Sequence, residues 1–424
     1  MWINNDLTLS SPYNPKNWIK RLRRQCEPNQ SIFPLQIQTN TSYPPSSTTT
    51  SITQAHTITQ GQDVHIAIID SGIDYTHREF TPTLQLNQDP SITPKPLLQE
   101  ERKPLLQLIQ QHKEHPIYDA QSFIDEDPYD DHRHGTTTAG ILSSQFLPSV
   151  TPKSKLTVLK ILDQQGHGTL QHFAKALQYL IQHPPHILTI SLAYYYSSNL
   201  VTNLLNTLHH NTLIFSAAGN NNSNLQLYPA NNPHTIAVNG HNQSKHRWSD
   251  SDTSLHHLGS NYGSHIQFAG PSYPQTVVRK LYNRTTVAQG TSLSSPFIAG
   301  LAALVMSIYY QTAHTYPTPD TVVKILRASA TNLDFLTHDL NQDHTVDILD
   351  LALLAKHFYT DHPAYDINQD HTIDILDLVQ LAKQFSQQDF HGRTDSLGYG
   401  VPDALKAVQL SRAIAHQHLE PSQP

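Results

Sequence analysis

The chain has 424 residues and a formal net charge of −7, and 37% of its residues are hydrophobic. That length is enough for one large α/β domain and an additional small one. The sequence has no basic stripe, which argues against nucleic acid as a partner. Its single cysteine, Cys26, excludes an intramolecular disulfide framework.

The N-terminal region, residues 1–50, is rich in Pro, Ser, Thr and Asn. This composition predicts an extension with little core of its own, expected to be poorly ordered. A short apolar segment, residues 32–37, could lie along the surface or in a cleft, although simple disorder is common at chain ends. We find no apolar signal segment and no run of about 18 apolar residues, so we expect no membrane span.

From residue 64 onward, the pattern of strand, loop and helix repeats along the chain. Helical periodicity at residues 136–143, 170–182 and 201–209 separates short apolar runs typical of buried parallel strands. This alternation predicts an α/β fold with a parallel sheet and helices on both faces. The charged, Pro-punctuated residues 78–118 predict a surface insertion that contains a helix at residues 97–113. The apolar runs are residues 64–69, 156–161, 187–192, 213–216 and 235–238.

Four short segments carry groups suited to nucleophilic catalysis. Asp70 ends the first apolar run, His134 begins a His-Gly-Thr segment, and Ser292 follows Gly-Thr and precedes an apolar helix. A serine hydroxyl needs an adjacent base, and that base needs a third group to fix its tautomer. We therefore predict Ser292 as nucleophile, His134 as base and Asp70 as the group that orients the base. Asn220 would donate its amide to the oxyanion, together with the Ser292 backbone N–H.

Simpler interpretations exist for each of these residues. Ser292 could be only a helix cap, and Asp70 could be an ordinary turn aspartate. Neighbouring residues of the same type also compete for each role: Asp74, Asp131, His132, Asn221, Asn222, Ser294 and Ser295.

The four segments, in the order Asp, His, Asn and Ser, resemble those of the subtilisin-like serine proteases. The resemblance covers residues 51–334 and resumes at residues 398–404. It implies a serine endopeptidase that hydrolyses protein or peptide substrates through an acyl-enzyme. It also implies an extracellular location, although the sequence itself leaves the compartment open.

The resemblance implies a substrate site as well. Ser191, Leu192 and Ala193 would form an edge strand that pairs with the substrate backbone, and Ala193 stands where the family usually has Gly. The wall of the primary specificity pocket would consist of Ala217, Ala218 and Gly219.

An internal repeat follows, because residues 339–350 recur 27 residues later as residues 366–377. Each copy has oxygen-bearing residues at positions 1, 3, 5, 7, 9 and 12, the pattern of a calcium loop. Solvated acidic loops without metal are the simpler alternative. His344 and His371 replace the usual Gly at position 6, and His tolerates positive φ. The predicted ligands are Asp339, Asn341, Asp343, Thr345, Asp347, Asp350, Asp366, Asn368, Asp370, Thr372, Asp374 and Asp377.

The terminal Asp of each loop and the pairing of two copies resemble a dockerin, a small all-α module of EF-hand type. That resemblance implies two calcium ions and a cohesin-like protein partner, whereas the chemical step itself requires no cofactor. The predicted parts are an extension (1–50), a peptidase domain (51–334), a calcium-binding insertion (335–391), and a final helix with its tail (392–424).

Two functions therefore compete. One is a serine endopeptidase, favoured by the complete triad and Asn220. The other is a calcium-dependent docking module carried on an inactive protease scaffold, favoured by the dockerin-like repeat. The position of the repeat inside the protease pattern indicates a structural role for it.

Overall fold

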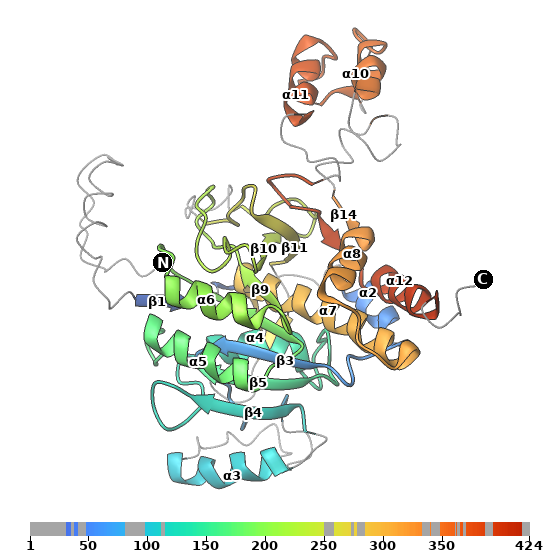
Figure 1. The fold of residues 1–424 in the computed structure, drawn as a ribbon. Coiled ribbons are helices and arrows are strands. Elements are labelled where there is room, and N and C mark those ends of the chain that lie inside the picture. The colour runs from blue at the N-terminus through green and yellow to red at the C-terminus, as the bar shows by residue number, and fades with distance from the viewer. Residues whose placement is uncertain are drawn as a thin grey trace, which may run out of the picture.

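A computed structural model gives the fold of the chain (Figure 1). It describes residues 31–34, 38–40, 48–80, 98–111, 115–249, 258–272, 275–277, 285–332, 340, 348–360, 362, 365–367, 370–385 and 393–417.

A seven-stranded parallel sheet forms the centre of the molecule, which confirms the predicted α/β class. Its strand order is β11-β10-β9-β7-β3-β5-β4. β3, which the sequence predicted, is an interior strand between β7 and β5, so its carboxyl end opens inside one edge of the sheet and not at its margin. The strands are β3 (His65–Asp70), β4 (Ile117–Ser122), β5 (Lys155–Lys160), β7 (Ile187–Ile190), β9 (Leu213–Ala217), β10 (Ile236–His241) and β11 (Ile266–Pro271).

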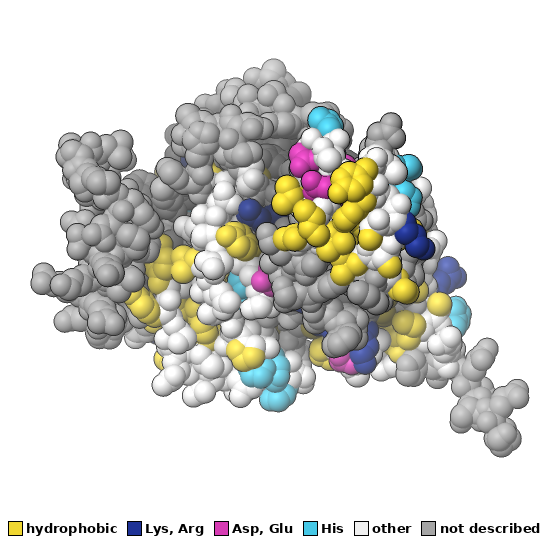
Figure 2. All heavy atoms as spheres, turned by 90° about the horizontal axis from the view of Figure 1, so that it is seen from above, with side chains coloured by type: hydrophobic (Ala, Val, Ile, Leu, Met, Phe, Trp, Pro, Cys, Tyr) yellow, Lys and Arg dark blue, Asp and Glu magenta, His cyan; other side chains and the backbone are white. Residues whose placement is uncertain are grey.

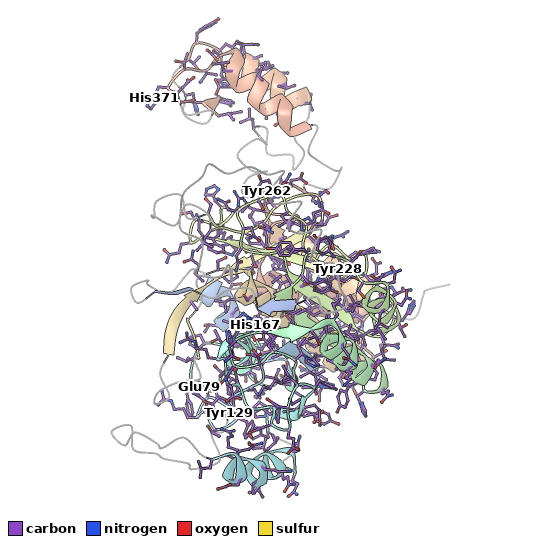
Figure 3. The ribbon with its side chains drawn as sticks, turned by 90° about the vertical axis from the view of Figure 1, so that its left-hand side faces the viewer. Glu79, Tyr129, His167, Tyr228, Tyr262 and His371 are labelled. Atoms are coloured by element: carbon purple, nitrogen blue, oxygen red, sulfur yellow. The ribbon has the colours of Figure 1, made fainter. Side chains whose placement is uncertain are left out.

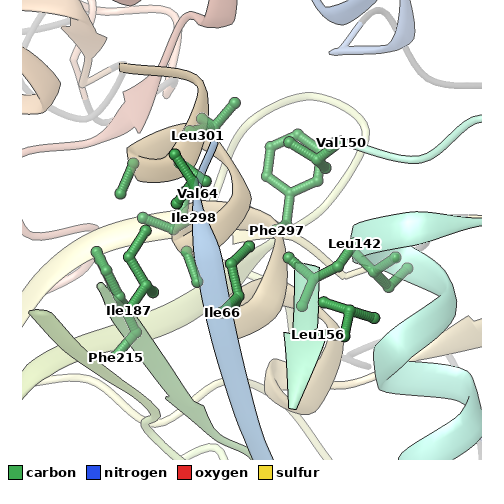
Figure 4. Packing of buried hydrophobic residues seen from close by; sticks show 14 of the residues in the cluster. Val64, Ile66, Leu142, Val150, Leu156, Ile187, Phe215, Phe297, Ile298 and Leu301 are labelled. Atoms are coloured by element: carbon green, nitrogen blue, oxygen red, sulfur yellow. The ribbon is translucent and has the colours of Figure 1, made fainter. Parts of the chain in front are cut away.

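Helices cover both faces of this sheet, as alternation of side chains along a strand requires. Ile66 and Ile68 of β3 belong to a large apolar cluster on one face that also includes Ile298 of α7. Figure 4 shows Ile66 and Ile298 in this cluster. Ala67 and Ile69 belong to a second cluster on the opposite face. The first face carries α2 (Thr48–Ala55), α4 (His134–Ser143), α7 (Thr291–Ala313), α8 (Pro319–Ser329) and α12 (Ala404–Gln417), and the second carries α5 (Leu170–Gln182) and α6 (Asn199–Leu208).

The helix expected in the surface insertion is present as α3 (Gln99–Gln111) and lies beside β4 (Figure 1). Arg102 of α3 forms an ion pair of 2.7 Å with Asp127 and stacks over the ring of Tyr129. These contacts attach α3 to the loop that leads to α4. Residues 81–97 of the predicted insertion lie outside the described residues.

By length and composition, α7 could cross a membrane. It is the only such helix among the described residues, and its apolar window is completely buried inside the protein. Core helices of globular domains have the same length and composition, so this is weak evidence for a span.

Two segments of the N-terminal extension form strands, although the sequence predicted an extension that is poorly ordered. β1 (Ser31–Pro34) pairs with β6 (Gly168–Thr169) and with β8 (Leu192–Ala193). β2 (Gln38–Asn40) joins a sheet with β12 (Gln275–Val277) and β13 (Thr285–Gln289). Both segments gain their backbone partners from distant parts of the chain, which composition alone cannot reveal.

The repeat contains two helices, α10 (Ile348–Ala355) and α11 (Ile375–Phe385), which lie apart from the main body in Figure 1. Leu354 and Leu381, which occupy equivalent positions in the two copies, form a small apolar cluster with Ile373. The repeat thus has its own core.

The two ends of the insertion meet at the main domain. β14 (Ala330–Thr331) pairs with β15 (Val401–Pro402). Asn332 Nδ2 also donates to Gly398 O at 2.9 Å. The main domain therefore closes the base of the insertion with contacts of its own.

Candidate active site

Asp70 and His134 lie in contact at the carboxyl edge of the sheet. His134 Nδ1 is 2.7 Å from Asp70 Oδ1 and 2.9 Å from Oδ2. The carboxylate also accepts from Ser71 N at 2.7 Å and from Thr138 Oγ1 at 3.3 Å, and both Asp70 and His134 are buried. A carboxylate only accepts, so Nδ1 carries the proton and Nε2 is the basic nitrogen.

Two glycines allow the segments of Asp70 and His134 to approach. A Cβ on Gly135 would lie 2.1 Å from the carbonyl oxygen of Gly72, closer than any side chain tolerates. Gly72 itself has φ of +106°, in the left-handed region that favours glycine. These two glycines therefore allow the backbone segments to come close enough for Asp70 and His134 to make contact.

Ser292 lies in the first turn of α7 and is fully buried. Pro296, four residues later, has no N–H to donate to the Ser292 carbonyl. Ser191 Oγ supplies that hydrogen bond instead, at 2.9 Å. Ser191, predicted to bind substrate, thus supports the start of α7. The helix N-terminus favours negative charge that develops beside Ser292.

Asn220 lies just after β9 and is held against the residue before Ser292. Thr291 donates to Asn220 Oδ1 twice, from its backbone N at 2.9 Å and from Oγ1 at 2.8 Å. Gly219 N donates to the same Thr291 hydroxyl at 3.2 Å. Because these bonds fix the oxygen end of the amide, its NH₂ end is directed away from Thr291.

Most competing residues are engaged elsewhere. Asp131 accepts from Lys160 at 3.2 Å, and Asp74 accepts from Thr76 at 2.5 Å. The hydroxyl of Ser294 donates to Pro271 O at 3.2 Å, Ser295 contacts Thr189 at 3.0 Å, and Asn222 accepts from Arg247 at 2.7 Å. Asn221 N donates to Asn261 Oδ1 at 2.9 Å.

His132 is the nearest alternative to His134. The two ring centroids are 6.2 Å apart. Burial, and then the neighbouring His134, lower the pKa of His132 to about 4. His132 is therefore neutral across the physiological range, and it is His134 whose Nδ1 contacts the Asp70 carboxylate.

β8, which contains two of the three residues predicted to pair with substrate, lies at the edge of a small sheet and pairs with β1. In the antiparallel pairing of β1 with β8, Phe33 lies opposite Ala193 and Pro34 opposite Leu192. An extended backbone therefore approaches Ala193 despite its Cβ. Ala217 ends β9 beside Ala218 and Gly219, and both alanines are fully buried, so their assignment to the wall of a specificity pocket stays a prediction.

Asp130, which was not predicted from the sequence, is fully buried beside the start of α4. Its carboxylate accepts from Ser71 Oγ at 2.8 Å and from Thr136 N at 2.8 Å. Burial raises its pKa, and hydrogen bonds from residues such as Thr136 act in the opposite direction. Asp130 stands three residues before the N-cap residue Arg133, so the usual N-cap pattern in the sequence does not mark it.

The second predicted calcium loop is described in larger part than the first. Asp366 accepts from the backbone N of Asp370 at 3.1 Å and of His371 at 2.9 Å, and Asp377 accepts from Ile367 N at 2.7 Å. His371, which Figure 3 labels in the insertion, has φ of +70°, as position 6 of such a loop requires.

One hydrogen bond occurs at the equivalent position in both loops. Leu340 N donates to Asp350 Oδ1 at 2.7 Å, as Ile367 N does to Asp377. Within the described parts of both loops, no group of three or more His, Cys, Asp and Glu side chains is gathered for a metal. The carboxylate and carbonyl oxygens still suit a hard cation such as calcium. Six predicted ligands lie outside the described residues: Asp339, Asn341, Asp343, Thr345, Asp347 and Asn368.

Comparison with known proteins agrees with this architecture. A model of the subtilase family matches residues 61–347, more than half of the chain, and a model of the dockerin type I domain matches residues 337–386. The chain is 28% identical over 250 residues to a thermophilic serine proteinase of Bacillus sp. (strain AK1), covering 57% of this chain and 52% of that protein.

Two further relatives are a thermostable alkaline protease of Halalkalibacterium halodurans and thermitase of Thermoactinomyces vulgaris. The first is 31% identical over 210 residues, covering 47% of this chain and 55% of the relative. Thermitase is 25% identical over 264 residues, covering 60% and 78%. The chain spans about half the length of the first two relatives. It belongs to the subtilase family and carries a dockerin type I domain.

Proposed function

We propose that the chain is a serine endopeptidase in which Ser292, His134 and Asp70 act as nucleophile, base and orienter. The observation that carries this proposal is the buried contact between His134 Nδ1 and Asp70, at 2.7 Å. It supports a basic Nε2 on His134. Membership in the subtilase family and the names of the curated relatives support peptide bonds as the substrate class.

In the proposed reaction, Ser292 Oγ attacks the scissile carbonyl while His134 Nε2 takes its proton. The imidazolium, stabilised by Asp70, then protonates the leaving amine, which leaves an acyl-enzyme that water hydrolyses by the same route. Charge on the tetrahedral oxygen would be stabilised by the Asn220 amide and the Ser292 backbone N–H.

We further infer that the substrate binds as an extended strand between β6 and β8. The support is that β1 of this chain already occupies such a position, paired with both strands. Main-chain pairing gives affinity for any extended peptide, and the small residues Ala217, Ala218 and Gly219 would form the wall that selects its side chain.

Turnover of a chromogenic peptide anilide tests the proposal. Ser292→Ala is expected to abolish turnover without changing the fold, as judged by circular dichroism. Ser294→Ala is the matched control, because Ser294 lies in the same helical turn and is also buried. Turnover retained by Ser292→Ala and lost in Ser294→Ala would move the nucleophile and contradict the assignment.

The insertion favours a second function, calcium-dependent docking to a cohesin-like protein. Leu349 and Leu376, which are equivalent in the two copies, are each 56% exposed, and Ile375 beside them is 57% exposed. Figure 2 looks down onto the molecule and shows hydrophobic side chains gathered next to acidic ones on this face. Repeated exposed leucines on a small module favour a protein partner.

Binding of a cohesin protein to the full chain, with and without a calcium chelator, tests this second function. The Leu349→Asp, Leu376→Asp variant is expected to lose binding while peptide turnover is retained. Binding that ignores both calcium and these leucines would exclude the docking role. Two calcium ions, one per loop, remain our proposal for the insertion, held by the residues named above.

A further inference from the structure

Asp130 is a buried carboxylate with five hydrogen-bond donors around it. Its Oδ1 accepts from Ser71 Oγ at 2.8 Å, from Arg133 N at 2.6 Å and from His132 N at 3.1 Å. Its Oδ2 accepts from Thr136 N at 2.8 Å and from Thr136 Oγ1 at 2.6 Å. Such a site accommodates an acceptor-only group, the ionised carboxylate.

These donors belong to the two segments that carry the proposed orienter and base. Ser71 follows Asp70 directly in the chain. Its hydroxyl donates to Asp130 and accepts from the backbone N of Gly135 at 2.9 Å, and Gly135 follows His134 directly. One hydroxyl, oriented by Asp130, therefore links the backbone after Asp70 to the backbone after His134.

Asp130 also takes over the capping of α4. Arg133 occupies the N-cap position, makes no side-chain cap hydrogen bond, and has φ of 91° in the left-handed region. A non-glycine residue in this region is strained, so the surrounding contacts must hold it there. Asp130 holds Arg133 through its N–H and satisfies the helix donor of Thr136. Between these two residues lies His134.

We propose that Asp130 is a positioning residue for the peptidase reaction, holding His134 at the proper distance from both Asp70 and Ser292. The inference rests on the proposed function. Asp130 acts through Ser71 and the first turn of α4.

Asp130→Asn tests this role. The amide keeps the shape of the carboxylate, but its NH₂ group is a donor and would face backbone N–H groups that are donors too. We expect kcat to fall about 10- to 100-fold with KM changed less than twofold, because a base displaced by about 1 Å costs up to 10² in rate. Asp125→Asn is the matched control. Asp125 lies on the same loop, is about half exposed and pairs with Lys160 at 2.6 Å.

A double-mutant cycle separates positioning from a general loss of structure. In a His134→Ala background, Asp130→Asn is expected to leave the residual turnover unchanged, because its effect passes through His134. A loss of the same factor in both backgrounds, or one explained by the fraction unfolded, would overturn the proposal.

Two further results keep the test decisive. Should Asp130→Asn fail to fold, Ser71→Ala carries the same test, with a smaller expected loss in kcat that also vanishes in the His134→Ala background. Full turnover by His134→Ala alone would instead contradict the proposed function, and that outcome is distinguishable from a failure of the positioning role.

Discussion

Ser292, His134, Asp70 and Asn220 come from distant parts of the chain, and neighbouring backbone contacts hold each of them. The carbonyl oxygen of Ser292 accepts a hydrogen bond from the Ser191 hydroxyl, because Pro296 has no N–H to donate to it. At the level of single residues, the site is therefore defined by supporting hydrogen bonds that can each be removed.

Asn220→Ala removes the proposed oxyanion donor. We expect kcat to fall by about 10²–10³ with little change in KM, a magnitude carried over from the corresponding donor of subtilisin. The loss falls on kcat because charge on the oxygen develops only in the transition state.

Asn221→Ala is the matched control, because Asn221 is the next residue and donates its backbone N–H to Asn261. An effect of Asn220→Ala on KM alone would move the oxyanion role elsewhere.

Among the structural elements, β1 has the most direct consequence for activity. It lies between β6 and β8, where we propose that substrate binds. A chain shortened by residues 1–40 is expected to have a several-fold lower KM for a peptide anilide, because the competing strand is gone. A chain shortened by residues 1–30, which keeps β1, is the control. Equal KM values for the two chains would show that β1 does not compete with substrate.

Elements with strong local signals could be predicted from the sequence. The apolar run at residues 64–69 and the helical periodicity at 170–182 gave β3 and α5 almost residue for residue. The strands of residues 31–34 and 38–40 could not be predicted, because their partners lie far away in the chain. Asp130 was missed for a related reason, since only the fold brings it to Ser71.

Across the whole molecule, buried histidines connect stability to pH. Burial is the main cause that lowers the pKa of His65, His77 and His241 to about 4. The unfolded chain, with a histidine pKa near 6.5, binds more protons between these values. The contribution of these histidines to the free energy of unfolding is therefore fully present above pH 6.5 and is lost as the pH drops toward 4.

Thermal melts between pH 7 and pH 4.5 check this. His77→Asn is expected to make the decline shallower, since it removes one group that must become charged on unfolding. His210→Asn, at an exposed position, is expected to leave the slope unchanged. An identical slope for the parent and His77→Asn would contradict the argument.

The insertion is expected to melt separately from the peptidase domain when calcium is removed. Calcium bound only to the folded loops stabilises each by about 2.7 kcal/mol at a hundredfold excess over Kd. The β14–β15 pair and Asn332 close the base of the insertion without metal. We therefore expect a chelator to lower the insertion's own melting transition and to leave peptide turnover within about twofold.

The Asp343→Ala, Asp370→Ala variant serves as control, because it removes a predicted ligand from each loop. An effect of the chelator on the activity of this variant would come from calcium bound elsewhere. If this variant lost turnover together with its melting transition, the insertion would be needed to hold the catalytic domain together.

The central claim is that Ser292 is a nucleophile activated by His134 and Asp70. Its most direct test is peptide mapping by mass spectrometry after reaction with a small fluorophosphonate, which bonds covalently to an activated serine. We predict one adduct, on Ser292, formed by the parent chain and lost in His134→Ala. An adduct on another residue, or none on the folded parent chain, would contradict the account.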